Sequence, residues 1–236
     1  MCPCCRWHFR RFLPFGVVVK RVNALCPRCG SLERHRLLWL YLKNRTDLFY
    51  NTHRVLHFAP EPVFAKVFQR MPLLQYVTAD LSSARASVRT DIMAIPCKDN
   101  SFDVVLCNHV LEHVLDDQKA MRELFRVLAP GGWAILQSPI ERQRAKTLED
   151  PMIVSPRERE RAFGQHNHLR MYGCDYKDRL EKAGFLVKVE GYSGELEKRD
   201  VSKYGLPNEE IYFCRKPLPP VTRGAVLAGI ASPVRN

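Results

Sequence analysis

The sequence predicts an α/β fold built on a doubly wound, mostly parallel sheet, and three features of residues 91–139 carry this prediction. The short apolar run 104–107 is rich in β-branched residues and bounded by polar ones, as in a buried strand of a parallel sheet. Apolar residues then recur at helical spacing over 121–128. The breaker 130–132, Pro-Gly-Gly, ends this helix, and a second apolar run, 133–136, follows it.

A strand, a helix and a second strand in this order form a βαβ unit, for which a right-handed crossover is expected. Polar side chains, among them Asn108, His109 and His113, come directly after the first strand of the unit. In open α/β sheets, ligands bind at the carboxyl ends of the strands. We therefore expect a binding site at this edge.

Length and composition predict one sizeable α/β core with a small appendage, because the chain has 236 residues and 46% apolar content. No apolar run approaches 18 residues, so we expect no membrane span. The start of the chain shows no apolar signal region, and the nine cysteines are an odd number that includes two C-x-x-C pairs. This pattern favours a reducing compartment, so we expect a cytoplasmic protein.

The net charge of +12 is concentrated at the two ends of the chain. Residues 1–45 hold ten Lys and Arg against one acid, and residues 215–236 hold four and no acid. Basic ends indicate a polyanionic partner such as nucleic acid, although thiolates bound to a metal would reduce the N-terminal charge.

The N-terminal segment 1–31 predicts a zinc ribbon. Two C-x-x-C pairs about twenty residues apart can place four thiolates on one Zn²⁺ in tetrahedral geometry. The apolar residues between the pairs suffice for a short β-hairpin; they are Phe9, Phe12, Phe15 and 17–19. The predicted ligands are Cys2, Cys5, Cys26 and Cys29.

Several alternatives to this site remain at the sequence level. Cys4 could replace Cys2 or Cys5, and His35 could replace a cysteine. The thiols could also be free or form a redox pair, although a redox C-x-x-C normally opens a helix after a strand.

Residues 32–52 predict a connecting helix and linker. Ser31 is a suitable N-cap. Arg34, His35 and Arg36 are expected on a solvated or phosphate-facing turn. An apolar stripe is expected to face the next domain; it comprises Leu32, Leu38, Trp39 and Leu42.

The run from Asp99 to Leu136, DNSFDVVLCNHVLEHVLDDQKAMRELFRVLAPGGWAIL, resembles the class I S-adenosylmethionine-dependent methyltransferases. The resemblance extends over about 54–216 and implies a Rossmann-like sheet of seven strands. It also implies S-adenosylmethionine as cofactor. We assign 53–216 to this domain and 217–236 to a loosely held tail.

The resemblance further implies which residues hold the cofactor. The turn after the first strand departs from the family's glycine-rich pattern, because His57 stands where an acid is usual and Ala59 and Glu61 stand at glycine positions. Such a turn either retains the cofactor, with Glu61 paired to its amino group, or marks lost binding. Asp80 would accept hydrogen bonds from the ribose hydroxyls. The other implied cofactor residues are Leu81, Asp91, Ile92, Asn108 and His113.

The polar insertion 141–172 is expected to act as a lid that carries substrate contacts, because it leaves the sheet at the binding edge. Gln165, Arg170 and Tyr172 are the predicted substrate residues. The predicted proton acceptors are His109, His166 and His168. The plainer alternative is a solvated loop and helix.

The leading functional hypothesis is methylation, at O or N, of a small polar metabolite or sugar-containing precursor. The alternatives are a zinc-ribbon RNA methyltransferase, favoured by the basic N-terminal segment, and a degenerate methyltransferase fold that serves as a binding module, favoured by the altered turn.

Overall fold

A computed structural model describes residues 1–16 and 20–220, and one seven-stranded sheet forms its centre. The strand order is β10-β11-β7-β6-β3-β4-β5. The strands of this sheet are β3 (His53–Phe58), β4 (Leu74–Asp80), β5 (Val88–Arg89), β6 (Phe102–Asn108), β7 (Leu128–Gln137), β10 (Leu186–Glu190) and β11 (Ile211–Arg215).

The pairing confirms the predicted doubly wound fold. The strands β3, β4, β5, β6 and β7 are parallel, whereas β11 runs antiparallel to β7 and to β10. The last two strands of the chain, β10 and β11, thus form an antiparallel pair at one edge of the sheet.

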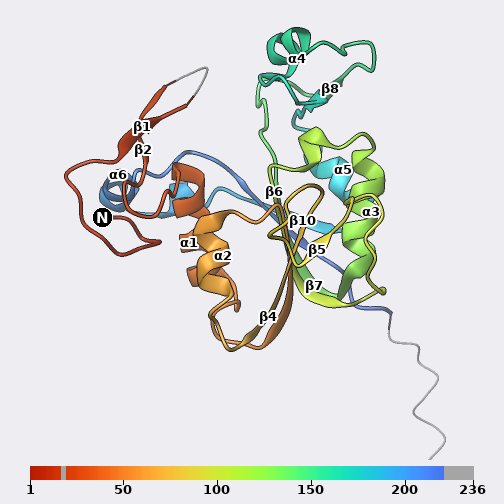
Figure 1. Ribbon diagram of the computed structural model, residues 1–236, viewed down its shortest axis with the longest axis horizontal. Coiled ribbons are helices and arrows are strands. Elements are labelled where there is room, and N and C mark those ends of the chain that lie inside the picture. Colours follow the sequence, from red (N-terminus) through yellow and green to blue (C-terminus); the bar gives the residue numbers. More distant parts are fainter. Residues whose placement is uncertain (17–19, 221–236) are drawn as a thin grey trace, which may run out of the picture.

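Helices cover both faces of the sheet (Figure 1). The helices α1 (Glu33–Arg45) and α2 (Pro62–Phe68) pack on one face, and α3 (Asp117–Val127) and α5 (Tyr176–Lys182) pack on the other. Each face has its own apolar core. Val55, Val104 and Leu106 point toward α1 and α2, whereas their neighbours Leu56 and Val105 belong to the opposite core, as strand alternation requires.

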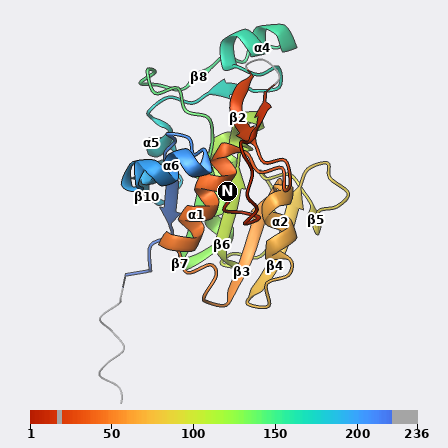
Figure 2. The ribbon, with the colours of Figure 1, turned by 90° about the vertical axis from the view of Figure 1, so that its left-hand side faces the viewer.

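Three smaller units surround the sheet (Figure 2). The antiparallel hairpin of β1 (Leu13–Phe15) and β2 (Arg21–Leu25) precedes α1, where the sequence predicts a ribbon. The expected hairpin residues 17–19 lie outside the described part of the chain. The insertion folds as β8 (Leu148–Glu149), α4 (Pro156–Phe163) and β9 (Arg170–Met171), at the carboxyl-end edge of the sheet. The remaining short helices are η1 (Leu111–His113), η2 (Tyr192–Glu195) and α6 (Lys198–Tyr204).

The Pro-Gly-Gly stretch does not end the helix, which corrects the sequence prediction. The helix α3 ends at Val127, and Leu128 is already extended, with a ψ of 134°. Gly131 N–H and Gly132 C=O bond to Lys216, so the stretch forms the first part of β7. A Cβ on Gly132 would lie 2.8 Å from the carbonyl oxygens of Ala129 and Asp103, which explains the requirement for glycine there.

The start of α1 also differs from the prediction. The N-cap is Leu32, whose N–H donates to His35 Nδ1 over 3.1 Å. Ser31 Oγ instead lies 3.2 Å from Cys2 Sγ and accepts from Cys29 Sγ at 3.3 Å. Arg36 is fully buried rather than solvated. Its guanidinium donates to four backbone carbonyls within 3.0 Å, those of Ala24, Ser31, Tyr204 and Gly205.

No helix in the described ranges is long and apolar enough to span a membrane. Of the predicted tail 217–236, only the residues up to 220 fall in the described part.

Candidate functional site

Two hollows lie at the carboxyl-end edge of the sheet, one on each side of the stretch after β6. The first, of about 290 Å³, lies over the ends of β3 and β4 and the stretch after β6, and we refer to it as the adenosine-side cavity. Six of the nine predicted cofactor residues line it: Ala59, Asp80, Leu81, Asp91, Ile92 and His113. Apolar residues complete the wall, among them Phe58, Val110 and Leu115.

The acid at the end of β4 is held in place by the turn that follows it. Asp80 Oδ1 accepts from the N–H groups of Ser82 and Ser83, at 2.8 and 2.7 Å. Burial opposes the ionised form, but these bonds keep the pKa of Asp80 below its ordinary value. A charged carboxylate therefore faces the cavity and can accept donors through its second oxygen. Asp91 is fixed in the same way by Met93 N–H at 2.8 Å.

The glycine-poor turn keeps the backbone shape that glycine would normally supply. Ala59 has a φ of 44°, in the left-handed region. Its N–H donates to Ala79 C=O at 2.8 Å, which anchors the turn to β4. Ala59 thus accepts backbone strain at the edge of the cavity, and such strain is common at functional sites.

Glu61 lies at the centre of a buried polar chain. Its carboxylate contacts His57 Nε2 at 2.7 Å and accepts from Asn108 Nδ2 at 3.1 Å. His57 is completely buried, and its Nδ1 contacts Tyr76 Oη at 2.8 Å. Burial would raise the pKa of Glu61, but the bond to His57 holds it below the ordinary value, so the group is a carboxylate.

The second hollow, of about 350 Å³, opens on the other side of β6, and we refer to it as the acceptor-side cavity. It is lined by His109, Gln137–Ile140, Arg142, Asn208–Glu210 and Tyr212. A narrow cavity of about 20 Å³ adjoins it and shares His109, Gln137 and Glu209. The narrow cavity reaches α1, where Arg34 and His35 line it.

His109 stands against a buried acid. Its Nδ1 lies 3.4 Å from Glu112 Oε1, and it has a φ of 54°. Glu112 is 1% exposed and accepts from Ser138 Oγ at 2.8 Å. Burial would raise the pKa of Glu112, but His109 and Ser138 together keep it below the ordinary value. Glu112 and Ser138 were not among the predicted site residues, although Glu112 lies three positions after His109 in the polar stretch.

The substrate roles predicted for Arg170 and Tyr172 need correction. Both side chains are buried, and the Arg170 guanidinium donates to the carbonyls of Leu111, Val114 and Leu115 and to Glu149. Tyr172 Oη donates to Asp117 at 2.8 Å. Their donors are therefore used within the protein, where they tie the insertion to the stretch after β6.

The three remaining residues predicted in the insertion also lie away from the acceptor-side cavity. Gln165 and His166 are exposed, and neither lines the two hollows. His168 is buried, with its ring 4.7 Å from that of His113 and its Nδ1 3.0 Å from Phe163 C=O. Glu112, His113 and His168 bring one ligand atom each within 4.8 Å of one another, so these side chains join η1 to the insertion.

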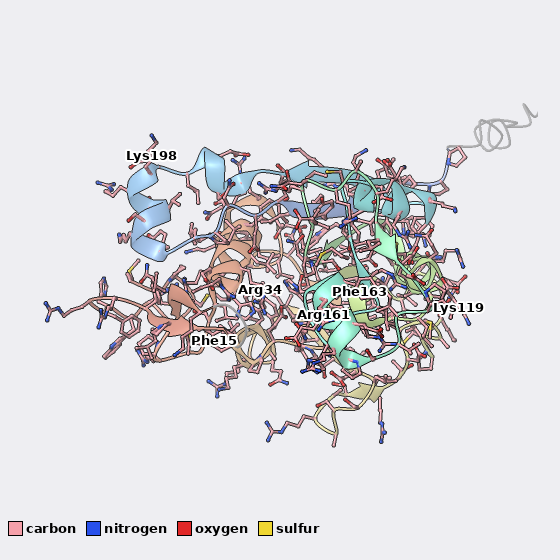
Figure 3. All side chains as sticks on the ribbon, turned by 90° about the horizontal axis from the view of Figure 1, so that it is seen from above. Phe15, Arg34, Lys119, Arg161, Phe163 and Lys198 are labelled. Carbon is pink, nitrogen blue, oxygen red and sulfur yellow. The ribbon has the colours of Figure 1, made fainter. Side chains whose placement is uncertain are left out.

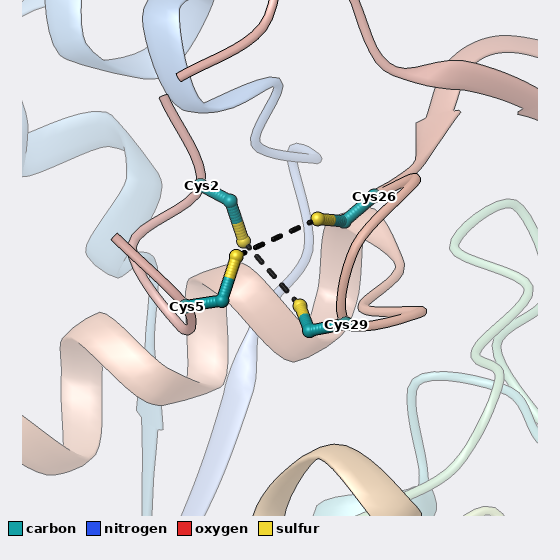
Figure 4. Close-up of side chains that lie close together, drawn as sticks. All are labelled: Cys2, Cys5, Cys26 and Cys29. Carbon is teal, nitrogen blue, oxygen red and sulfur yellow. Dashed lines mark hydrogen bonds between the residues drawn. The ribbon is translucent and has the colours of Figure 1, made fainter. Parts of the chain in front are cut away.

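The four predicted zinc ligands come together at the base of the hairpin (Figure 4). Their Sγ atoms all lie within 4.8 Å of one another, with 3.7 Å between Cys2 and Cys29 and 3.8 Å between Cys5 and Cys26. Zn–S bonds of about 2.3 Å in a tetrahedron place sulfur atoms about 3.8 Å apart. The donor set therefore fits Zn²⁺. Cys4 is not part of this cluster and directs its thiol toward His35 C=O.

Comparison with known proteins agrees with this architecture. Residues 65–136 match the family described as "Methyltransferase domain". The chain is 36% identical over 132 residues to a probable S-adenosylmethionine-dependent methyltransferase of Mycolicibacterium smegmatis, which covers 53% of this chain and 47% of that protein. The chain spans about half or less of the length of the curated relatives it matches.

Two solved structures share the fold. The (4+2)-cyclase SpnF superposes with a TM-score of 0.55 and 17% identity, over 80% of this chain and 84% of that one. An S-adenosylmethionine-dependent methyltransferase from Mesorhizobium loti gives a TM-score of 0.53 and 14% identity, over 76% and 98%. At these identities the likeness concerns the fold alone.

Proposed function

We propose that this chain, which carries a class I methyltransferase domain, transfers a methyl group from S-adenosylmethionine to a small polar acceptor. The adenosine-side cavity is the observation that carries the proposal. It lies where parallel α/β sheets bind ligands, and it presents the Asp80 carboxylate beside apolar walls. An acid that accepts two donors suits a ribose, and apolar walls suit a purine.

The cofactor, when bound, supplies a methyl group activated by a sulfonium centre. Asp80 would hold the ribose hydroxyls, and Asp91 with Ile92 would hold the adenine. His57 would act indirectly, because its ring is buried behind Glu61 and orients that carboxylate. The turn at Ala59 brings the backbone close to the ligand without a glycine.

The acceptor-side cavity is the proposed place of the methyl acceptor. The stretch after β6 separates it from the adenosine-side cavity, since His109 lines the one and Val110 the other, and its lining is rich in polar groups. His109 is positioned to receive a proton from an acceptor hydroxyl or amine through Nε2, because Nδ1 faces the Glu112 carboxylate. Glu112 would set the ring orientation and stabilise the protonated imidazole, and Ser138 holds Glu112 in turn.

The insertion would act on this site indirectly. Arg170 donates to Leu111 C=O and Tyr172 donates to Asp117, so both hold the stretch that follows β6 in place. Residues 110 and 113–115 of this stretch line the adenosine-side cavity. The exposed His166 remains a candidate for contact with a larger acceptor.

We further propose that Cys2, Cys5, Cys26 and Cys29 bind one structural Zn²⁺. The support is the donor geometry together with Ser31, whose hydroxyl lies within 3.3 Å of Cys2 Sγ and Cys29 Sγ and can donate its proton to one of the two as a thiolate.

A second function, RNA methylation, is favoured by one observation. The hairpin side presents the exposed cations Arg10, Arg11 and Lys20 to solvent, so a phosphate backbone could bind there. The (4+2)-cyclase with the same fold shows why a binding role or another reaction stays an alternative.

Calorimetric titration with S-adenosylhomocysteine tests the main proposal. We expect binding by the wild-type protein and a loss of about 1–3 kcal/mol in Asp80→Ala, the usual value for hydrogen bonds to a charged group. Asp178→Ala, an exposed acid on α5, is the control and should bind as the wild type does. Absence of binding by the folded wild type would leave the binding-module alternative, whereas salt-dependent binding of RNA would favour the second function.

A further inference from the structure

The narrow cavity beside α1 contains polar atoms that lack partners. Within residues 1–16 and 20–220, six buried side-chain N or O atoms have no hydrogen-bond partner. Three of the six, Arg34 Nε, His35 Nε2 and Asn108 Oδ1, belong to residues that line this one cavity. Buried polar atoms in proteins nearly always have a hydrogen-bond partner, so three unpartnered ones at one place indicate a site for a polar ligand.

The donor and acceptor pattern of the cavity can be assigned. Leu32 N–H donates to His35 Nδ1, so the proton of the neutral ring is on Nε2, which is a donor. The ring packs edge-on to Phe64 with centroids 5.7 Å apart, which fixes its direction. Burial lowers the pKa of His35 to about 4, so the ring is neutral near pH 7.

The same cavity also presents acceptors. Asn108 uses its Nδ2 to donate to Glu61 Oε1, which leaves Oδ1 as a free acceptor. The Glu61 carboxylate belongs to the same lining and is charged. The cavity therefore offers a cation and an N–H donor from Arg34 and His35 of α1, and a carboxylate and an amide oxygen from Glu61 and Asn108, which follow β3 and end β6.

This arrangement complements a zwitterionic amino-acid group, whose carboxylate would face α1 and whose ammonium would face Glu61. The narrow cavity and the adenosine-side cavity lie on either side of two short stretches, 58–61 and 108–110. S-adenosylmethionine has an adenosine at one end and such an amino-acid group at the other.

We infer that Arg34 and His35 of α1 bind the carboxylate of the methionine part of the cofactor, while Glu61 and Asn108 accept from its ammonium group. The inference rests on the proposed function. It makes α1, which precedes the sheet, a part of the cofactor site. In the view from above, the label of Arg34 on α1 stands between those of Phe15 of the hairpin and Phe163 of α4 (Figure 3).

The cysteine cluster would position these two residues. The helix α1 begins at Glu33, four residues after Cys29, and Ser31 contacts two of the sulfur atoms. Arg36 ties the same turn to Ala24 C=O and Ser31 C=O. The hairpin, the metal site and the first turn of α1 thus form one connected support for the cavity.

Two ligands separate this inference from the proposed function. S-adenosylhomocysteine carries the amino-acid group, whereas 5′-methylthioadenosine has the adenosine and the sulfur but lacks that group. Arg34→Met and His35→Asn are the test variants; the asparagine keeps an acceptor near the position of Nδ1 and removes the Nε2 donor. His35→Gln, which restores an N–H near Nε2, and Arg45→Met, at the exposed end of α1, are the controls.

Calorimetry should show that Arg34→Met and His35→Asn each weaken S-adenosylhomocysteine binding about tenfold or more, since each loses a hydrogen bond to a charged group. Binding of 5′-methylthioadenosine should not change, and His35→Gln should recover most of the loss. Thermal melting in the absence of ligand confirms that each variant is folded.

Three results would overturn the inference. Unchanged S-adenosylhomocysteine affinity in both variants would show that Arg34 and His35 do not bind the amino-acid group. Equal losses for both ligands would show that α1 acts only through the fold. A wild type that binds both ligands with equal affinity would show that the amino-acid group makes no net contribution. If the folded wild type binds neither ligand, the proposed function itself fails.

Discussion

Replacement of Arg170 by methionine tests whether this residue supports the site or contacts substrate. The guanidinium is 4% exposed and donates to the carbonyls of Leu111, Val114 and Leu115, as well as to Glu149. Methionine fills similar space but leaves these acceptors without their donor. A buried acceptor left without a partner costs about 1–3 kcal/mol, and loss of one member of a buried ion pair costs about 3–5 kcal/mol.

We expect Arg170→Met to lower the free energy of unfolding by about 3–5 kcal/mol, the cost of removing one partner of a buried ion pair. The loss should not exceed this range, because Asp117 keeps its bonds to Arg179 and Tyr172 and because water can reach part of the loop. Urea unfolding with linear extrapolation measures the change. The exposed Arg161 on α4 is the control, and Arg161→Met should change stability by less than about 0.5 kcal/mol. An Arg170→Met protein as stable as the wild type that has lost acceptor binding would refute this reasoning.

Three further predictions concern the metal, the sheet and pH. Freshly purified protein should contain about one zinc per chain, and Cys26→Ser should lose the zinc, melt at a lower temperature and bind S-adenosylhomocysteine more weakly. The control Cys174→Ser, at an exposed position, should keep the zinc, the melting temperature and the affinity, and a zinc-free wild type that melts and binds normally would contradict this prediction. Gly132→Ala should lose about 1–3 kcal/mol of stability, because its Cβ would lie 2.8 Å from two carbonyl oxygens. Gly194→Ala, with nothing within 4 Å of its Cβ, is the control in the same urea assay, and equal stability of the two variants would show that β7 can shift. The pKa of His35 falls from 6.5 to about 4 on folding, so between these pH values the unfolded chain binds one more proton than the folded chain. The free energy of unfolding should therefore fall as the pH drops from 6.5 to 4, by at most about 1.4 kcal/mol per pH unit. This slope against pH should be smaller in His35→Gln, and identical slopes would show that His35 does not titrate as inferred.

The sequence by itself determined those features that depend on local pattern. Apolar runs and their spacing identified the strands and α3, since burial on a pleated sheet or a helical face imposes a period on the chain. The acid that ends β4 and the polar stretch after β6 lie at the carboxyl-end edge of the sheet, as predicted, because the carboxyl ends of parallel strands lie together. The paired C-x-x-C spacing also led to the four cysteines that the structure gathers at one point.

Only the tertiary structure decided the roles of the long polar side chains. The sequence predicted a solvated or phosphate-facing turn for Arg36 and a substrate contact for Arg170, yet each is buried and bonded to carbonyls from distant segments. Glu112 was noted only as part of a motif, but folding places it against His109 and Ser138. Likewise, Arg34 and His35 join Glu61 and Asn108 only when α1 packs on the sheet. The physical reason is that the partners of a buried charge lie far away in the chain, so no local period records them, and the cost of burying a charge unpaired makes the folded protein supply those partners.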